Sequence, residues 1–127
     1  MASWIVWTRA NGAKIEVPAA NVATVSVRNK ELTFEGPGGQ VAWFNLDHIV
    51  GYKMDGKTDT YPVRLQGPNG LEEVKVDGST PPKVETIDGT KFLDFRGTND
   101  KQPVARFVLD SVVGHGNIGP SGVRSRL

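Results

Sequence analysis

Few residues in this chain could do chemistry, and their spacing does not assemble a catalytic group. His48 and His115 are the two histidines, and a metal site would need further ligands from distant carboxylates. The absence of cysteine excludes disulfides, thiolate metal ligands and a cysteine nucleophile. The patterns G-x-S-x-G, H-E-x-x-H and Walker A do not occur. We therefore expect no metal, no cofactor and no enzymatic activity.

One glycine motif, Gly114-x-Gly116-x-x-Gly119, matches the dinucleotide-binding pattern. That pattern requires a strand before it, a helix after it and a βαβ unit around it. Here only eight residues follow, and they include Pro120 and Gly122. The motif therefore indicates a flexible end of the chain and not a nucleotide site.

Asp47 and Asp110 resemble a carboxylate pair because they stand in matching segments. The sequence V-A-W-F-N-L-D-H-I-V-G-Y at residues 41–52 recurs as V-A-R-F-V-L-D-S-V-V-G-H at residues 104–115, with seven of twelve positions identical. In both segments the apolar alternation slips after the leucine, which predicts a bend. We expect each aspartate to turn the chain through side-chain to backbone hydrogen bonds, which is a structural role.

The recurrence extends over most of the chain and predicts its architecture. Short alternating apolar runs, separated by turn signals such as Asn29-Lys30 and Asp88-Gly89, indicate strands, and no segment has a helical period. We expect an all-β protein with two tandem repeats of about sixty residues, at 3–53 and 61–115. Because units of that size bury too little surface alone, both should share one core as a pseudo-two-fold sandwich or closed barrel.

These repeats make residues 1–116 a single β domain, followed by a flexible Gly/Arg arm at residues 117–127. The arm has too few apolar side chains to fold alone, so any order in it must come from another surface. We expect its apolar and basic side chains to contact a partner. They are Val123, Arg124, Arg126 and Leu127.

The two faces of the recurring strand differ in how well the copies agree. One face keeps alanine, phenylalanine and leucine in both copies, whereas Trp43 on the opposite face is replaced by Arg106. We expect the retained face to line the core and the divergent face to be edge or surface. Trp43 is then either an exposed anchor for a partner, as interfaces favour, or the cap of a secondary cluster under a loop. On the first interpretation Trp43 and Arg106 are binding residues.

Charge and hydropathy limit the class of partner. The 15 Lys and Arg residues nearly balance the 14 Asp and Glu residues, which argues against nucleic acid, because its binders have a clustered basic face. No apolar run is long enough for a transmembrane helix, and the N-terminus lacks a signal-peptide pattern. We expect no membrane contact and a cytoplasmic location in the producing cell.

Two functions are consistent with these features. The first is a non-catalytic assembly or structural protein that contacts copies of itself or a host protein, for example a decoration-type accessory component of a virus or phage particle. The alternative is a soluble module that binds a small molecule or nucleotide. A deep pocket with convergent polar groups would favour the alternative, whereas a flat interface rimmed by aromatic side chains would favour assembly.

Overall fold

The computed structural model describes residues 3–9, 12–55, 59–67, 70–78, 80–96 and 103–116. These residues form twelve strands, three short 3-10 helices and no α-helix, so the prediction of a mostly β protein is confirmed. No helix in these ranges is both long enough and apolar enough to cross a membrane.

The elements follow the same order in the two halves of the chain. The first half contains β1 (Ser3–Thr8), β2 (Lys14–Pro18), η1 (Ala19–Asn21), β3 (Thr24–Arg28), β4 (Glu31–Gly36), β5 (Gly39–Asn45), η2 (Leu46–His48) and β6 (Ile49–Met54). The second half contains β7 (Asp59–Gly67), β8 (Gly70–Asp77), β9 (Lys83–Ile87), β10 (Thr90–Phe95), β11 (Ala105–Val108), η3 (Leu109–Ser111) and β12 (Val112–His115).

Two hairpins turn where the sequence predicts. Asn29 and Lys30 join β3 to β4 with φ of 53° and 61°, and Asp88 and Gly89 join β9 to β10 with φ of 50° and 83°. Positive φ at both central residues is typical of the type I′ turn, whose twist matches that of the flanking strands. Glycine and asparagine adopt this conformation at low cost, which explains the turn chemistry of these segments.

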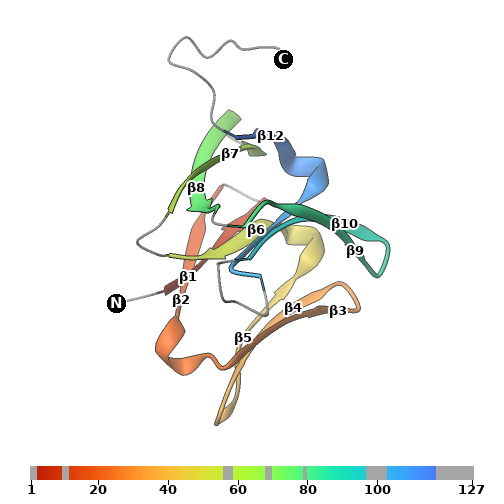
Figure 1. Ribbon diagram of the computed structural model, residues 1–127. Coiled ribbons are helices and arrows are strands. Elements are labelled where there is room, and N and C mark those ends of the chain that lie inside the picture. Colours follow the sequence, from red (N-terminus) through yellow and green to blue (C-terminus); the bar gives the residue numbers. More distant parts are fainter. Residues whose placement is uncertain are drawn as a thin grey trace.

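The strands form three antiparallel sheets, and none of them is closed. A six-stranded sheet has the order β2-β1-β6-β11-β10-β9, and two three-stranded sheets have the orders β12-β7-β8 and β3-β4-β5. Figure 1 shows the six-stranded sheet between the other two, with β3, β4 and β5 at the lower end of the view and β12 at the upper end.

Two apolar clusters hold the three sheets together. Strand β1 contributes to both, because Trp4 and Val6 face the β3-β4-β5 sheet whereas Trp7 faces the β12-β7-β8 sheet. This alternation is the period-two pattern of a strand that is covered on both faces. All three side chains are buried. The tryptophans of the first strand are therefore core residues.

The pairings of the first half recur in the second. Strand β1 pairs with β2 and β6, as β7 pairs with β8 and β12. Strand β4 pairs with β3 and β5, as β10 pairs with β9 and β11. Both β1·β6 and β7·β12 have a register shift, at which Val50 and Val113 are left without a register partner.

Two groups of four aromatic rings also recur with matching contacts. Each group makes four ring contacts, and three of the four involve the phenylalanine of the central strand, β4 in the first group and β10 in the second. The first contains Trp4, Phe34, Phe44 and Tyr52, and the second contains Tyr61, Phe95, Phe107 and His115 in the corresponding places. The ring centroids lie between 5.5 Å (Tyr61 to Phe95) and 6.4 Å (Phe95 to Phe107) apart, the range of favourable aromatic pairs.

One pairing has no counterpart elsewhere in the described residues. Strand β6 of the first half pairs with β11 of the second and joins the halves into the six-stranded sheet. We refer to this β6·β11 pairing as the junction. Its register partners are Ala105 with Lys53, Arg106 with Tyr52, and Phe107 with Gly51.

The junction corrects the expectation for the divergent face of the recurring strand. In β5 that face is exposed, as expected for Trp43. In β11 it is covered, because Val108 is buried in the cluster beneath the β3-β4-β5 sheet. Phe107 is fully buried, whereas Phe44 is only half-buried. The reason is that β11 lies inside a sheet covered on both faces and β5 lies at a sheet edge.

Candidate functional site

The outer face of β5 is an apolar surface at an unpaired sheet edge. We define the β5 surface as Val41 and Trp43, whose exposed fractions are 39% and 47%. Strand β5 pairs with β4 on one side, and no backbone hydrogen bond from another described strand reaches its other side. An unpaired strand edge can accept a further strand, and an exposed tryptophan is a common interface anchor.

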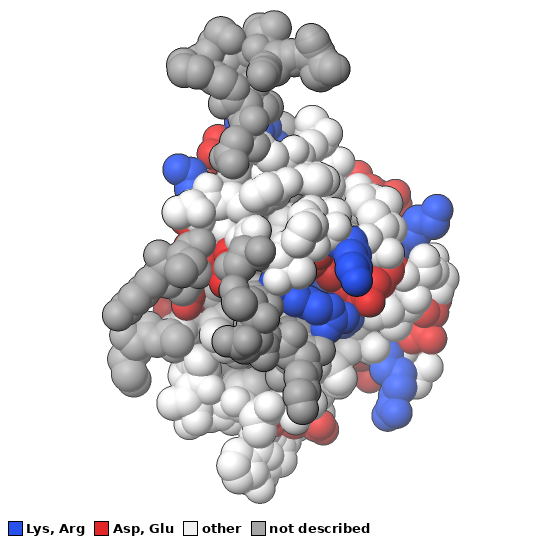
Figure 2. Space-filling view, viewed as in Figure 1, with Lys and Arg blue, Asp and Glu red and all other residues white. Residues whose placement is uncertain are grey.

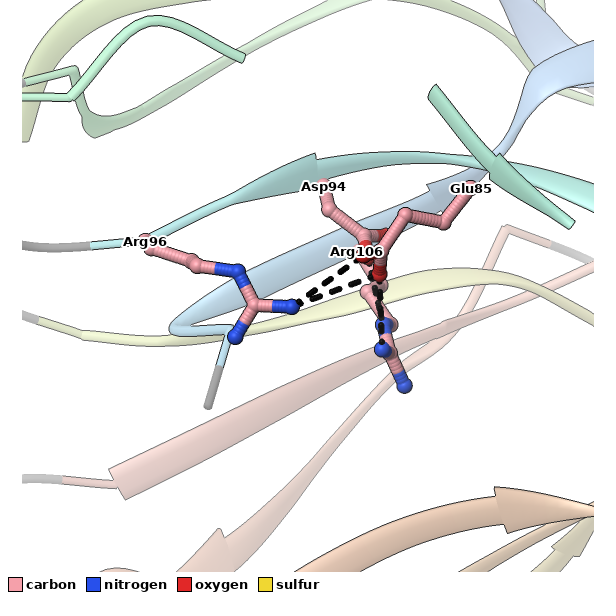
Figure 3. A network of polar contacts seen from close by, with 4 residues as sticks. All are labelled: Glu85, Asp94, Arg96 and Arg106. Atoms are coloured by element: carbon pink, nitrogen blue, oxygen red, sulfur yellow. Dashed lines mark hydrogen bonds and ion pairs between the residues drawn. The ribbon is translucent and has the colours of Figure 1, made fainter. Parts of the chain in front are cut away.

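Arg106 stands where Trp43 stands in the recurring segment, but its side chain is only 11% exposed. Figure 3 shows it within a polar network that includes Glu85, Asp94 and Arg96. The Nε of Arg106 lies 3.1 Å from Oδ2 of Asp94, and its Nη2 donates to Oε1 of Glu85 at 3.2 Å. Arg96 approaches Oε2 of the same glutamate at 3.3 Å. Arg106 is therefore paired within the chain, at the junction.

Burial sets the ionisation of this network. Burial, together with hydrogen bonding to Glu85, raises the pKa of Asp94 to about 7. Hydrogen bonding to Asp94, with the charges of Arg96 and Arg106, lowers the pKa of Glu85. Burial raises the pKa of Tyr52, the register partner of Arg106, to about 12. The two carboxyl groups thus differ in acidity because Asp94 is the more deeply buried, and Arg106 serves both.

A second polar group lies between the two halves at the base of β7 and β8. Lys53 is buried, and its Nζ contacts the carboxylate of Asp59 and donates to the backbone oxygen of Lys75 at 2.7 Å. A more exposed carboxylate, that of Asp55, lies 3.8 Å away. The ammonium group is thus neutralised where the chain passes from β6 to β7. No group of three or more His, Asp or Glu side chains in the described residues could hold a metal ion.

A polar hollow of about 540 Å³ lies where the two 3-10 helices η2 and η3 approach one another. Arg9 ties them together, because its backbone amide donates to the oxygen of His48 at 2.9 Å and its Nη1 donates to Oγ of Ser111 at 3.2 Å. The lining includes three cationic and two acidic side chains. It consists of Arg9, Lys30, Leu46, Asp47, Gly89, Thr90, Lys91, Val108 and Asp110.

Asp47 and Asp110 both line this hollow, and neither turns the chain as predicted. The bend before β6 is capped by Asn45, whose Oδ1 accepts from the amide of Asp47 at 3.0 Å. The corresponding bend before β12 has no side-chain cap, because Val108 stands in the place of Asn45. Among the described residues no side-chain to backbone bond from either aspartate is present, so that expectation is not confirmed. Both carboxylates are exposed at the surface of the hollow.

Charges of opposite sign lie close together on the described part of the face in Figure 2. Lysine and arginine side chains there lie beside aspartate and glutamate side chains, and most of the remaining described surface is uncharged. Long-range attraction of a polyanion requires a surface of one sign. This face does not present one.

The sequence-predicted binding residues do not gather in one place. Trp43 is exposed on β5, whereas Arg106 is enclosed at the junction. Residues 117–127 lie outside the described residues, and with them the four predicted contacts of the arm: Val123, Arg124, Arg126 and Leu127.

Sequence reasoning missed the Glu85–Asp94 pair. The available signal was an acid between two bulky apolar residues, Leu93 and Phe95, in the middle of a strand. No known family model, curated protein or solved structure matches this chain.

Proposed function

We propose that this protein is a non-catalytic assembly protein that acts through contacts with copies of itself or with a host protein. The observation that supports this function best is the β5 surface, an apolar patch of Val41 and Trp43 on a strand with a free edge. Val41 lies at a register shift between β4 and β5, an irregularity of the kind that blunts sheet edges. Trp43 lies beyond this shift, in the regularly paired part of β5, and an exposed tryptophan is typical of a contact surface.

We also infer that residues 3–53 and 61–115 are two structural repeats. Their shared strand pairings and matching ring clusters support this inference. Each repeat is then a small sandwich of two three-stranded sheets. A closed pseudo-two-fold arrangement would also require β12 to pair with β5, as the equivalent of the β6·β11 junction. The described strands make only the junction, so we infer that the repeats are joined head to tail.

The setting that we propose is an accessory role on a larger particle, such as a decoration-type component of a virus or phage. A protein in such a role acts by docking in many copies and needs no catalytic group. Binding of the purified protein to purified particles, followed by co-sedimentation, tests this setting. If the protein remains in the supernatant at saturating concentration, the setting is wrong.

Self-association is tested by the native mass of the protein over a range of concentrations, measured by analytical ultracentrifugation. We expect species heavier than the 13.8 kDa monomer, in a proportion that rises with concentration. The variant Trp43→Lys should shift the distribution toward the monomer, because it places a charge on the β5 surface. Val84→Lys is the matched control, since Val84 is 55% exposed on β9, in another sheet. Equal masses for the two variants would contradict a contact through Trp43.

A second candidate function follows from the polar hollow between η2 and η3. Three cations, Arg9, Lys30 and Lys91, line it together with two carboxylates, and such a site suits a small molecule with an anionic group. Titration calorimetry with ATP and with inorganic phosphate tests this function. Loss of heat in the double variant Lys30→Ala/Lys91→Ala would support it, and no heat with the wild-type protein would exclude these two ligands.

A further inference from the structure

At the junction, strand β11 covers the edge of β6. A second copy of the chain could cover the edges of the equivalent strands, β12 and β5, in the same way. The equivalence of the halves matches β6 with β12, and β11 with β5. The junction joins β6 to β11. The corresponding contact would join β12 to β5, and the described chain does not make it.

Side chains in or next to the junction have exposed counterparts on β12 and β5. Arg106 on β11 is enclosed at the junction, whereas its counterpart Trp43 on β5 is half exposed. Val50, next to the junction on β6, is 4% exposed and belongs to the cluster under the β12-β7-β8 sheet, whereas its counterpart Val113 on β12 is 60% exposed.

A pair of glycines gives an independent indication. At Gly51 a Cβ atom would overlap the ring of Phe107 and lie 2.5 Å from the backbone oxygen of Arg106, because the neighbouring strand β11 passes so close. Its counterpart Gly114 has no heavy atom of the described residues within 4 Å of such a Cβ, its two neighbours in sequence apart. The close approach that requires glycine is therefore present at Gly51 and absent at Gly114 in the isolated chain.

We propose that β12 of one copy pairs antiparallel with β5 of a second copy, in the register of the junction. This register sets His115 opposite Trp43 of the next copy, Gly114 opposite its Phe44, and Gly116 opposite its Ala42. The contact closes the edges of β12 and β5 and covers Trp43. It rests on the proposed function, because it specifies the partner and the geometry of the self-association.

The occupant is a second copy because the chain carries both complementary edges at opposite ends of the molecule (Figure 1). They therefore do not meet within one chain. The contact joins two different surfaces, so it is heterologous and produces a ring if the rotation closes or a filament if it does not. A symmetric dimer, in which β5 meets β5, is the competing geometry.

Gly114→Val tests the contact. The side chain has open space in the isolated chain, and φ of Gly114 lies outside the left-handed region, so the melting temperature should equal that of the wild type. The added atoms would collide with Phe44 of the next copy, so the heavier species should disappear in analytical ultracentrifugation. The matched control is Gly38→Val, which also has open space but lies in the β4–β5 turn, outside the paired stretch.

Cysteine cross-linking tests the register without depending on Gly114. The chain has no cysteine, so Trp43→Cys and His115→Cys each introduce a single thiol. Opposed residues of antiparallel strands lie within disulfide range, about 4.5–5.5 Å between Cα atoms. The mixture of the two variants should form a disulfide-linked dimer under mild oxidation, and each variant alone should not. Dimers of Trp43→Cys alone would instead indicate the symmetric contact and overturn the proposal.

The outcomes separate this contact from the proposed function. A wild-type protein that stays monomeric at every concentration contradicts the β12–β5 contact and self-association, and leaves contact with a host protein as the remaining form of the proposed function. A wild-type protein that associates while Gly114→Val associates equally, or while the mixed cysteine variants remain unlinked, contradicts the β12–β5 contact and leaves self-association standing. If Gly114→Val fails to fold, its premise of open space is wrong, and the cysteine mixture decides the register.

Discussion

Arg106 and Tyr52 are register partners across the junction, and each affects the ionisation of the other. The guanidinium lowers the pKa of the phenol, but burial of the ring outweighs this effect and raises that pKa to about 12. Arg106 in turn serves the carboxylates of Asp94 and Glu85. The contact that joins the two halves therefore includes a charged network beside buried apolar side chains.

Removal of Arg106 should be costly because it leaves the buried carboxyl of Asp94 without its cation. At pH 8, above the pKa of Asp94, we expect Arg106→Leu to lower the free energy of unfolding by about 3–5 kcal/mol, the usual loss when one partner of a buried ion pair is removed. Arg96→Ala is the control. This partly exposed arginine approaches the same Glu85, and its loss should cost about 1 kcal/mol or less. Urea unfolding of both variants measures the difference.

The double variant Arg106→Leu/Asp94→Leu should recover much of that loss, because an apolar pair of similar volume often replaces a buried ion pair without cost. A double variant no more stable than Arg106→Leu would show that the network is needed for packing at the junction.

The stability of the protein should fall as pH rises from about 4 to 7. The pKa of Asp94 is raised from 3.8 to about 7 in the folded protein, so the folded state holds a proton there that the unfolded state has lost. The difference corresponds to at most about 4 kcal/mol, because one unit of pKa is about 1.4 kcal/mol. The lowered pKa of Glu85 acts in the opposite direction, but mainly below its usual 4.5.

Asp94→Asn keeps the shape of the side chain and replaces the ionisable carboxyl group with an amide that does not titrate. We expect this variant to lose most of the decline between pH 4 and 7. Thermal unfolding in buffers across this interval measures the change. A wild-type melting temperature that rises with pH would contradict the raised pKa of Asp94.

Phe107 and Phe44 occupy equivalent positions in the two halves but should differ in their contribution to the free energy of unfolding. Phe107 is fully buried at the junction, and Phe107→Ala should cost about 3–5 kcal/mol. Phe44 is half-buried on the edge strand β5, so Phe44→Ala should cost distinctly less in the monomer. Urea unfolding at low protein concentration compares the two. Equal losses would mean that the edge of β5 is covered in solution under those conditions.

The sequence predicted what depends on local pattern. The turns at Asn29-Lys30 and Asp88-Gly89 follow from φ preferences, and the alternation in residues 41–46 fixes which side chains share a face. The burial of Arg106 could not be predicted in this way. It depends on which strand pairs with β11, and that strand is β6, more than fifty residues away in the sequence. The alternation of side chains along a strand shows which residues share a face. It does not show whether one face or both faces of the strand are covered by another sheet.

The Glu85–Asp94 pair escaped prediction for a related reason. An acid at the centre of an apolar strand predicts that its side of the strand faces solvent. In a sheet with one face in solvent that prediction would hold. In the six-stranded sheet both faces are covered, so the acid is buried and requires a cation from the adjacent strand β11. Trp43 and Arg106 occupy matching positions in the two recurring segments, which marks this position as divergent. Only the fold shows which of the two side chains is covered.

The last prediction concerns Gly51, which lies where β6 and β11 approach most closely. A Cβ atom there would meet the ring and Cα of Phe107 and the backbone oxygen of Arg106, so the two strands would have to move apart. We expect Gly51→Ala to lower the free energy of unfolding by about 1–3 kcal/mol, the typical cost of overpacking a core, and to shift amide signals along both strands. Gly38→Ala introduces the same methyl group into open space and should leave stability nearly unchanged. Urea unfolding and amide spectra of the two variants provide the comparison. If Gly51→Ala proves as stable as Gly38→Ala, the strands of the junction are not held at this separation, and the contact proposed for Gly114 loses its template.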